Sequence, residues 1–219
     1  MQDKCFFCDG SGYFENTLLE KSEICPVCKP TERELAARRN ALIDDRLHGV
    51  PFVAAKHIGP LFQNPPTLLV IHSGQSGPGI AEYFINPVEK LPDGSFQERI
   101  VSAHLAYSAT RNEFVQCVPL NRVAWHVGGS RYLGNRRLNF CSIGVELPGP
   151  YDAHRGIIEL GKFRYLVESL LRRMPTLKTA VRHCDIDAKK KDPGDGFEWS
   201  WLSGFGLDLP FSLAGKYQP

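Results

Sequence analysis

The feature that most constrains the fold is a short run in which every residue is apolar, Leu68-Leu69-Val70-Ile71. Successive side chains of a strand point to opposite faces of the sheet, so a strand that is apolar throughout must be covered on both faces. Such strands belong to the buried centre of a sheet. The run therefore predicts an α/β domain, whose beginning we place at Thr67.

Three further segments have the pattern of strands. Residues 100–109 and 113–118 are expected to form a hairpin around the turn at residues 110–112. Residues 142–147 alternate, so that the apolar side chains of this segment share one face and Glu146 lies on the other. A carboxylate in the middle of a strand is unfavourable unless its face is solvated or functional.

One segment has a clear helical pattern. Residues 157–174 carry apolar side chains at helical spacing, and Pro175 is expected to end the helix. Trp199 and Trp201, near the end of the chain, are expected to close the core.

Composition excludes some classes of protein. The net charge of +2 is not gathered into a basic stripe, so nucleic acid is not an expected partner. No apolar stretch reaches the roughly 20 residues of a membrane span. The first ten residues lack the pattern of a secretory signal. We expect synthesis in the cytoplasm, with action there or after release to the periplasm or wall by phage lysis or specialised secretion.

The N-terminal segment carries two CxxC pairs, which comprise Cys5, Cys8, Cys25 and Cys28. Their spacing, with 16 residues between the pairs, is in the range of a structural zinc site with four cysteine ligands. The first pair continues as CxxCxGxG, which is the form of DnaJ-type zinc modules. A pair of redox dithiols is the alternative. The module could bind a protein or the wall, or only stabilise the fold.

These patterns divide the chain into three parts. Residues 1–30 are predicted to be the zinc ribbon, residues 31–66 a helix and connector, and residues 67–219 the main domain. Thr31 and Glu34 form a capping box that starts the predicted helix at residues 31–48.

Three residues in the main domain are candidate ligands of a catalytic metal. His72 follows the buried strand, and His183 and Asp192 lie nine residues apart before the Pro193-Gly194 turn. Taken singly, His72 is as readily a structural histidine, and Asp192 a turn residue. Together the three have the composition of a hydrolytic zinc site, which keeps a fourth position for water.

Two charged residues suit the chemistry of such a site. Glu146 is the candidate general base for the attacking water. Lys190 precedes Asp192 by two residues, and it would stabilise negative charge on a carbonyl oxygen.

Eight stretches, in order and at similar spacing, resemble the zinc-dependent N-acetylmuramoyl-L-alanine amidases. This amidase-2 superfamily includes phage-type lysozyme-amidases and peptidoglycan recognition proteins, and the likeness is greatest to the cytosolic branch that trims anhydro-muropeptides. The stretches are Leu68–His72, Val101–His104, Val115–Pro119, Ala124–His126, Ser142–Leu147, His183–Ile186, Lys190–Gly194 and Phe197–Trp199.

The resemblance implies a mixed sheet flanked by helices, with zinc in a surface groove. It implies that His72, His183 and Asp192 bind the zinc and that Glu146 and Lys190 are catalytic. The implied reaction is hydrolysis of the bond between the lactyl group of N-acetylmuramic acid and L-alanine.

The resemblance also suggests residues that contact the substrate. His126, Arg137 and Asn139 match positions where the family's groove is lined or substrate contacts are expected, whereas His104 is expected to be structural. Ser73 stands where the recycling enzymes often carry Asn, so recycling, an endolysin and a secreted effector all stay open. A non-catalytic peptidoglycan-binding protein is the alternative of a different class.

Overall fold

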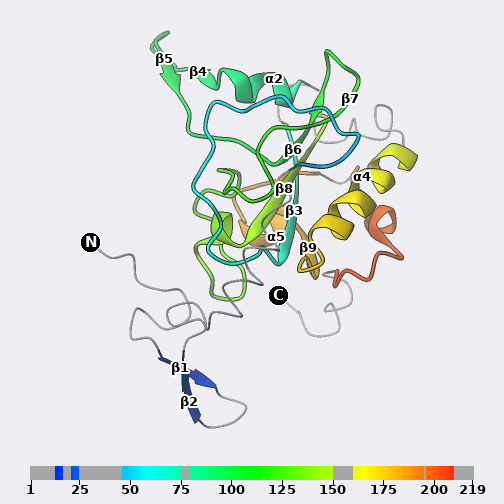
Figure 1. Ribbon diagram of the computed structural model, residues 1–219. Coiled ribbons are helices and arrows are strands. Elements are labelled where there is room, and N and C mark those ends of the chain that lie inside the picture. Colours follow the sequence, from blue (N-terminus) through cyan, green and yellow to red (C-terminus); the bar gives the residue numbers. More distant parts are fainter. Residues whose placement is uncertain are drawn as a thin grey trace.

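A computed structural model describes residues 13–16, 21–24, 46–74, 79–149, 160–194 and 196–209. Its main sheet has five strands in the order β7-β6-β8-β3-β9 (Figure 1). Strand β7 is antiparallel to β6, and the other neighbours are parallel, so the sheet is mixed, as expected. The strands are β3 (Leu68–Ser73), β6 (Leu105–Ser108), β7 (Glu113–Gln116), β8 (Ser142–Leu147) and β9 (Thr179–Arg182).

Strand β3 is the buried strand that the sequence predicts. It lies between β8 and β9, and all six of its residues are buried. Leu69 and Ile71 belong to the core under helix α4 (Leu160–Arg173), and Leu68 and Val70 belong to a separate cluster on the opposite face. Both faces of β3 are therefore covered by apolar side chains.

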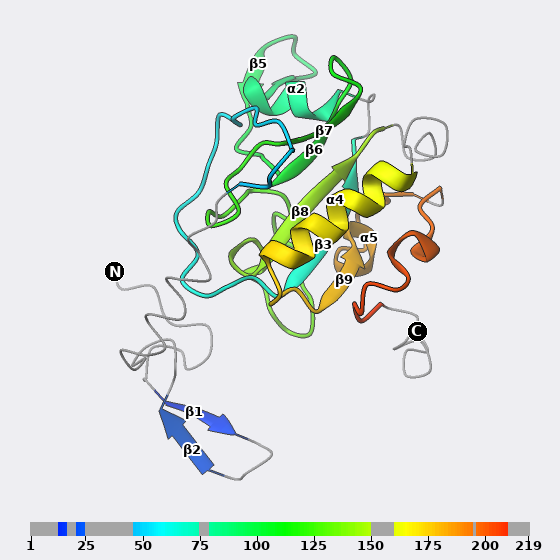
Figure 2. The ribbon, with the colours of Figure 1, turned by 45° about the vertical axis from the view of Figure 1, so that its right-hand side comes forward.

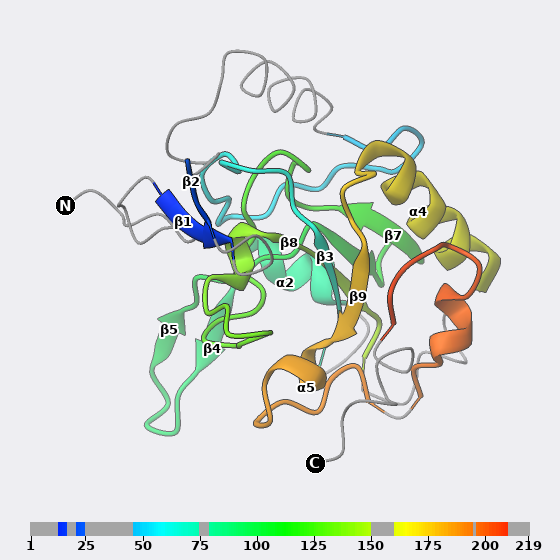
Figure 3. The same ribbon diagram turned by 90° about the horizontal axis from the view of Figure 1, so that it is seen from below.

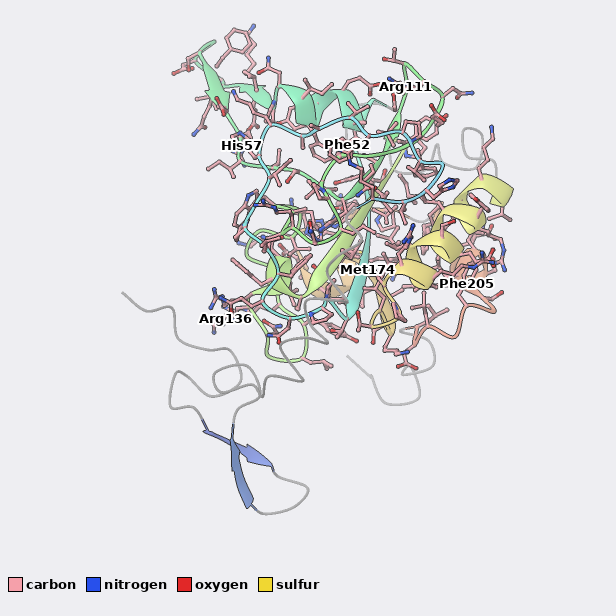
Figure 4. The ribbon with its side chains drawn as sticks, in the orientation of Figure 1. Phe52, His57, Arg111, Arg136, Met174 and Phe205 are labelled. Carbon is pink, nitrogen blue, oxygen red and sulfur yellow. The ribbon has the colours of Figure 1, made fainter. Side chains whose placement is uncertain are left out.

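Helix α4 covers one face of the sheet and lies across β8 and β3 (Figure 2). The predicted helix is confirmed over residues 160–173, while residues 157–159 lie outside the described part. The side chains that α4 buries are Phe163, Leu166, Val167 and Leu170. Met174 follows at its end, and Phe205 lies beside the helix under the guanidinium of Arg164 (Figure 4).

The tryptophans near the end of the described chain lie on a short 3-10 helix, η2 (Trp199–Leu202). Trp201 is buried in the core and packs edge-on against Phe163, and Trp199 is partly buried beside it. The predicted closing of the core by these side chains is confirmed.

The predicted hairpin is confirmed, but its first strand is shorter than expected. Strand β6 begins at Leu105, because the residues before it bond elsewhere. The amide of Ser102 donates to the carbonyl of Trp125, and the amide of His104 donates to that of Gly144. These bonds join the segment to the loop and strand that carry the site described below.

The remaining elements lie around this sheet. Helix α2 (Ile80–Ile85) packs on β6 through Ala81 and Phe84 and leads into a small antiparallel pair, β4 (Val88–Lys90) and β5 (Phe96–Glu98). A short 3-10 helix, η1 (Leu138–Phe140), precedes β8. Helix α5 (His183–Ile186) follows β9 directly (Figure 3).

Near the N-terminus, β1 (Tyr13–Asn16) and β2 (Lys21–Ile24) form a two-stranded antiparallel sheet. Cys5, Cys8, Cys25 and Cys28 lie outside the described residues, so their zinc site stays a prediction. Residues 31–45 of the predicted helix at 31–48 also lie outside the described residues, and residues 46–48, which are described, are not helical. Among the described residues, no helix is long and apolar enough to cross a membrane.

Candidate active site

The site lies on the face of the sheet opposite α4, and strand alternation places its first two residues there. Ile143, Val145 and Leu147 of β8 point into the core under α4, so Glu146 points to the other face. His72 of β3 is the register partner of Glu146 in the parallel ladder. The mid-strand carboxylate thus lies next to the first candidate ligand.

His183 and Asp192 are held by the turn of chain that follows β9. His183 begins α5, and the amide of Arg182 before it donates to the carboxylate of Asp185 at 2.8 Å. The amide of Cys184 donates to the backbone carbonyl of Asp192 at 3.0 Å. This bond ties the loop that carries Asp192 back onto the start of α5.

The three candidate ligands converge on one point. The Nδ1 atoms of His72 and His183 are 3.0 Å apart, and Oδ2 of Asp192 lies 3.3 and 2.9 Å from them, respectively. Ligand atoms bound to a tetrahedral zinc at 2.0–2.1 Å are about 3.3 Å from each other. The spacing therefore fits three corners of a zinc tetrahedron. Among the described residues, this is the one group of at least three His, Cys, Asp or Glu ligands within such reach.

The protonation states of these groups are those of metal ligands. Burial lowers the pKa of His72 to about 4, so its ring is neutral at pH 7. Burial alone would raise the pKa of Asp192, but its close contacts with the two histidine rings hold it well below its usual range. The site therefore combines neutral imidazole with an ionised carboxylate, the forms that zinc binds.

The proton on His183 is placed by a serine. The hydroxyl of Ser130 lies 2.5 Å from the carbonyl of Val127 and 3.2 Å from Nε2 of His183. A carbonyl oxygen only accepts, so the single hydroxyl proton goes to Val127, and the serine oxygen accepts from Nε2–H of His183. In the neutral ring this tautomer has its lone pair on Nδ1, aimed at Nδ1 of His72 and at Asp192, an arrangement that fits a bound cation.

The pKa of Glu146 is shifted by its surroundings. Burial and, to a smaller extent, the charge of Asp192 raise the pKa of this partly buried carboxyl to about 8, against the opposing effect of Lys190. Lys190 is exposed at the mouth of the site. Burial and these two opposing charges together place the titration of Glu146 near neutral pH, where a side chain can both accept and return a proton.

A cavity of about 750 Å³ opens onto these groups. Its volume is that of a binding site for a small organic ligand. The residues that line it include the three candidate ligands together with Glu146 and Lys190. Its walls come from α2 and β4 and from the chain around Arg99 and Trp125.

Comparison with known proteins assigns the family. A profile described as N-acetylmuramoyl-L-alanine amidase matches residues 62–195. The chain belongs to this amidase family. Two relatives are the 1,6-anhydro-N-acetylmuramyl-L-alanine amidases AmpD of Enterobacter cloacae and Escherichia coli K12. The first is 36% identical over 62% of this chain and 78% of that protein. The second is 34% identical over 62% of this chain and 79% of that protein.

Similarity of structure agrees with the family assignment. The crystal structure of a selenomethionine AmpD derivative matches with a TM-score of 0.58 and 27% identity, over 75% of this chain and 98% of that one. The mixed sheet and its helices are therefore the fold of an AmpD-like member of the amidase family.

The three residues that the family resemblance suggested for substrate contact are placed differently from one another. His126 lines the cavity, whereas neither Arg137 nor Asn139 is among its lining residues. The side-chain oxygen of Asn139 instead accepts the amides of His126 and Val127, and the guanidinium of Arg137 lies over the ring of Phe140. Substrate contact by these residues stays a prediction, and Asn139 has a visible role in holding the loop of His126.

Sequence reasoning missed two serines of the site, Ser130 and Ser142. Ser142 shares the site face of β8 with Glu146, so strand alternation could have marked it. Its hydroxyl lies 3.1 Å from Nε2 of His126. Ser130 follows two glycines in a loop, where no local pattern indicates that it meets His183, 53 residues away.

Proposed function

We propose that this chain is a zinc-dependent amidase that cleaves the bond between N-acetylmuramic acid and L-alanine in muropeptides. The observation that carries the proposal is the convergence of His72, His183 and Asp192 at ligand spacing beside Glu146. The preferred substrate class would be 1,6-anhydro-muropeptides, the class in the names of relatives that align over more than three quarters of their length.

The three side chains would hold zinc at the cavity that they line. When bound, zinc supplies Lewis acidity, which lowers the pKa of water to about 7 and polarises a carbonyl group. Three ligands from histidine and carboxylate are the usual set of a hydrolytic zinc site, in contrast to the closed four-ligand sites that serve structure.

Glu146 would move the proton. Its carboxylate accepts a proton from the attacking water and returns it to the nitrogen of L-alanine as the amide bond breaks, which makes that nitrogen a good leaving group. With a cation at the neighbouring ligands, the pKa of Glu146 falls below about 8, because nearby positive charge favours the carboxylate. The base is then available at neutral pH.

Lys190 would stabilise the charge that builds up on the substrate. Attack on the amide carbonyl leaves negative charge on its oxygen, and the ammonium group of Lys190 stands on the cavity wall with Glu146 and Asp192.

The test is hydrolysis of a purified anhydro-muropeptide, with release of the stem peptide measured by liquid chromatography and mass spectrometry. Glu146→Gln should lower kcat by about 10²–10⁴-fold. It should still bind zinc at the site. Glu168→Gln, on the exposed side of α4, is the matched control and should be as active as the unchanged protein.

Two results would overturn the proposal. One is full activity in Glu146→Gln or after removal of zinc. The other is binding of the muropeptide without cleavage by the zinc-loaded protein, which would identify a recognition protein. Faster cleavage of intact sacculi than of soluble anhydro-muropeptides would indicate wall lysis in place of the proposed substrate class.

We also propose a structural zinc at Cys5, Cys8, Cys25 and Cys28, supported by their paired spacing. The purified protein should then contain two zinc ions per chain. Cys25→Ser should lose one and His183→Ala the other. If the protein contains one zinc ion and Cys25→Ser retains it, the proposed N-terminal zinc site is wrong.

A further inference from the structure

The nitrogen of His72 that faces away from the ligand cluster is held by a chain of hydrogen bonds. Nε2 of His72 lies 2.9 Å from Nδ1 of His126. Nε2 of His126 lies 3.1 Å from the hydroxyl of Ser142, which in turn lies 2.6 Å from the carbonyl of Leu138. The four residues form one continuous path from the backbone to the candidate metal ligand.

The backbone carbonyl at the end of this path fixes which atom donates and which accepts in each of its hydrogen bonds. The carbonyl of Leu138 only accepts, so the one proton of the Ser142 hydroxyl points to it. The serine oxygen must then accept from His126, which places that ring's proton on Nε2. Nδ1 of His126 is therefore a lone pair, and it accepts from Nε2–H of His72. Nδ1 of His72 is left without a proton, on the side of His183 and Asp192.

The position of the His126 ring is set by its surroundings as well as by these bonds. Asn139 accepts the amide of His126 at 3.1 Å and the next amide at 3.0 Å, which holds the backbone. The ring lies against Gly144 of β8, where an added Cβ would come within 2.6 Å of Nδ1 of His126. The glycine leaves the room that brings His126 within reach of His72.

We propose that His126 is a positioning residue, which fixes the tautomer and orientation of His72 so that Nδ1 binds the metal. This inference rests on the proposed zinc-dependent function. It gives His126 a task distinct from the substrate contact expected from sequence. Hydrogen-bonded partners of this kind behind a ligating histidine are worth about 10–100-fold in metal affinity.

The test compares two substitutions that differ in one hydrogen bond. His126→Leu keeps apolar volume but leaves Nε2–H of His72 without an acceptor. His126→Asn places an amide oxygen near the position of Nδ1 and restores that acceptor. Zinc affinity is measured by chelator competition, and His183→Ala gives the background from any other zinc site. We expect about 10–100-fold weaker binding for His126→Leu. His126→Asn should recover most of this loss, and the exposed His48→Leu should change nothing.

Nitrogen-15 NMR of the zinc-loaded protein provides a second measurement, independent of activity. In the unchanged protein, His72 and His126 should both carry their proton on Nε2. Gly144→Ala gives a further variant with His126 intact, and it should weaken zinc binding by displacing the ring. If His126→Leu does not fold, His126→Asn and Gly144→Ala decide the matter.

The outcomes separate this inference from the function on which it rests. Zinc affinity in His126→Leu equal to that of the unchanged protein, or an Nδ1–H tautomer at His72, would overturn the role of His126 and leave the zinc amidase standing. Absence of zinc at the site in the unchanged protein would instead overturn the proposed function.

Discussion

Four histidines lie close together beside the sheet, and their partners distinguish structural from functional roles. His104 is fully buried, donates through Nε2 to the carbonyl of Arg122 at 2.8 Å and accepts the amide of Gly144 at 3.1 Å. Both of its nitrogens are thus occupied by the backbone, which confirms its predicted structural role. The nitrogens of His72 and His183 instead leave one lone pair each for a ligand.

The burial of His104 should make the protein sensitive to acid. Burial lowers the pKa of this ring from 6.5 to about 4. As the pH falls, His104 is therefore protonated in the unfolded chain before it is protonated in the folded protein. It does not change the pH dependence of stability above pH 6.5, and it destabilises the fold as the pH falls toward 4. The free energy of unfolding should drop by about 3 kcal/mol over this range from His104 alone. Urea unfolding between pH 7 and pH 4 measures it.

A comparison with His104→Gln isolates this contribution from those of other groups. The variant should be less stable at pH 7, because it loses the fit of the ring between two backbone groups. The difference in the free energy of unfolding between the two proteins should become smaller as the pH falls. Parallel pH curves for the two proteins would show that His104 does not cause the acid sensitivity.

Lys190 should influence both the rate and its pH dependence. Its positive charge lowers the pKa of Glu146, so Lys190→Ala should raise that pKa. Because the proposed role of Glu146 requires the deprotonated carboxylate, the acidic limb of kcat/KM should move to higher pH. The loss of charge stabilisation should also lower kcat by about 10²-fold.

The neighbouring Lys189→Ala is the matched control for Lys190→Ala, because Lys189 is exposed and does not line the cavity. Steady-state rates from pH 5 to pH 9 compare the variants with the unchanged protein. If the acidic limb of kcat/KM is unchanged in Lys190→Ala, then Lys190 does not influence the ionisation of Glu146.

At the scale of elements, the strands were predictable because their patterns are local. The apolar run at Leu68 marks β3, and the alternation after Ser142 gives the bounds of β8 and the face of Glu146. The loop between β7 and β8 has no such period. His126 lies in it and reaches a partner 54 residues away, and this kind of contact leaves no trace in local sequence.

Helix α4 should contribute to stability through its buried side. Leu170 is fully buried among the residues that join α4 to the sheet. Leu170→Ala should lower the free energy of unfolding by about 2–5 kcal/mol, because it removes apolar contacts and leaves a cavity. Urea unfolding of the zinc-loaded protein measures the change.

Tyr165→Ala on the same helix is the control, because Tyr165 is 59% exposed. It should alter stability by no more than about 0.5 kcal/mol. Equal losses for Leu170→Ala and Tyr165→Ala would contradict the assignment of the buried side.

At the scale of the whole molecule, the candidate ligands join distant parts of the chain. His72 comes from β3 at the centre of the sheet, and Asp192 comes from a loop 120 residues later. Each residue type and its motif could be predicted from the sequence and the family resemblance. That the two side chains meet depends on the parallel arrangement of β3 and β9, which no single segment encodes.

Zinc should therefore stabilise the fold as well as supply chemistry. A ligand that binds only the folded chain adds about 2.7 kcal/mol when its free concentration is 100 times Kd. Thermal unfolding should shift to higher temperature on adding zinc to the metal-free protein. His183→Ala should lose the part of this shift that belongs to the catalytic site. The same shift in both proteins would mean that zinc does not join these segments.

The hydrogen-bond paths behind the two histidines proposed to bind zinc end on the carbonyls of Val127 and Leu138. Every amino acid carries this oxygen, so replacing either side chain leaves the last acceptor in position if the loop keeps its shape. Mutation can replace the serines or His126, but it cannot remove these two backbone carbonyls. Substitutions can therefore disturb the orientation of the two candidate ligands through the side chains along each path, but the backbone acceptor at the end of the path stays.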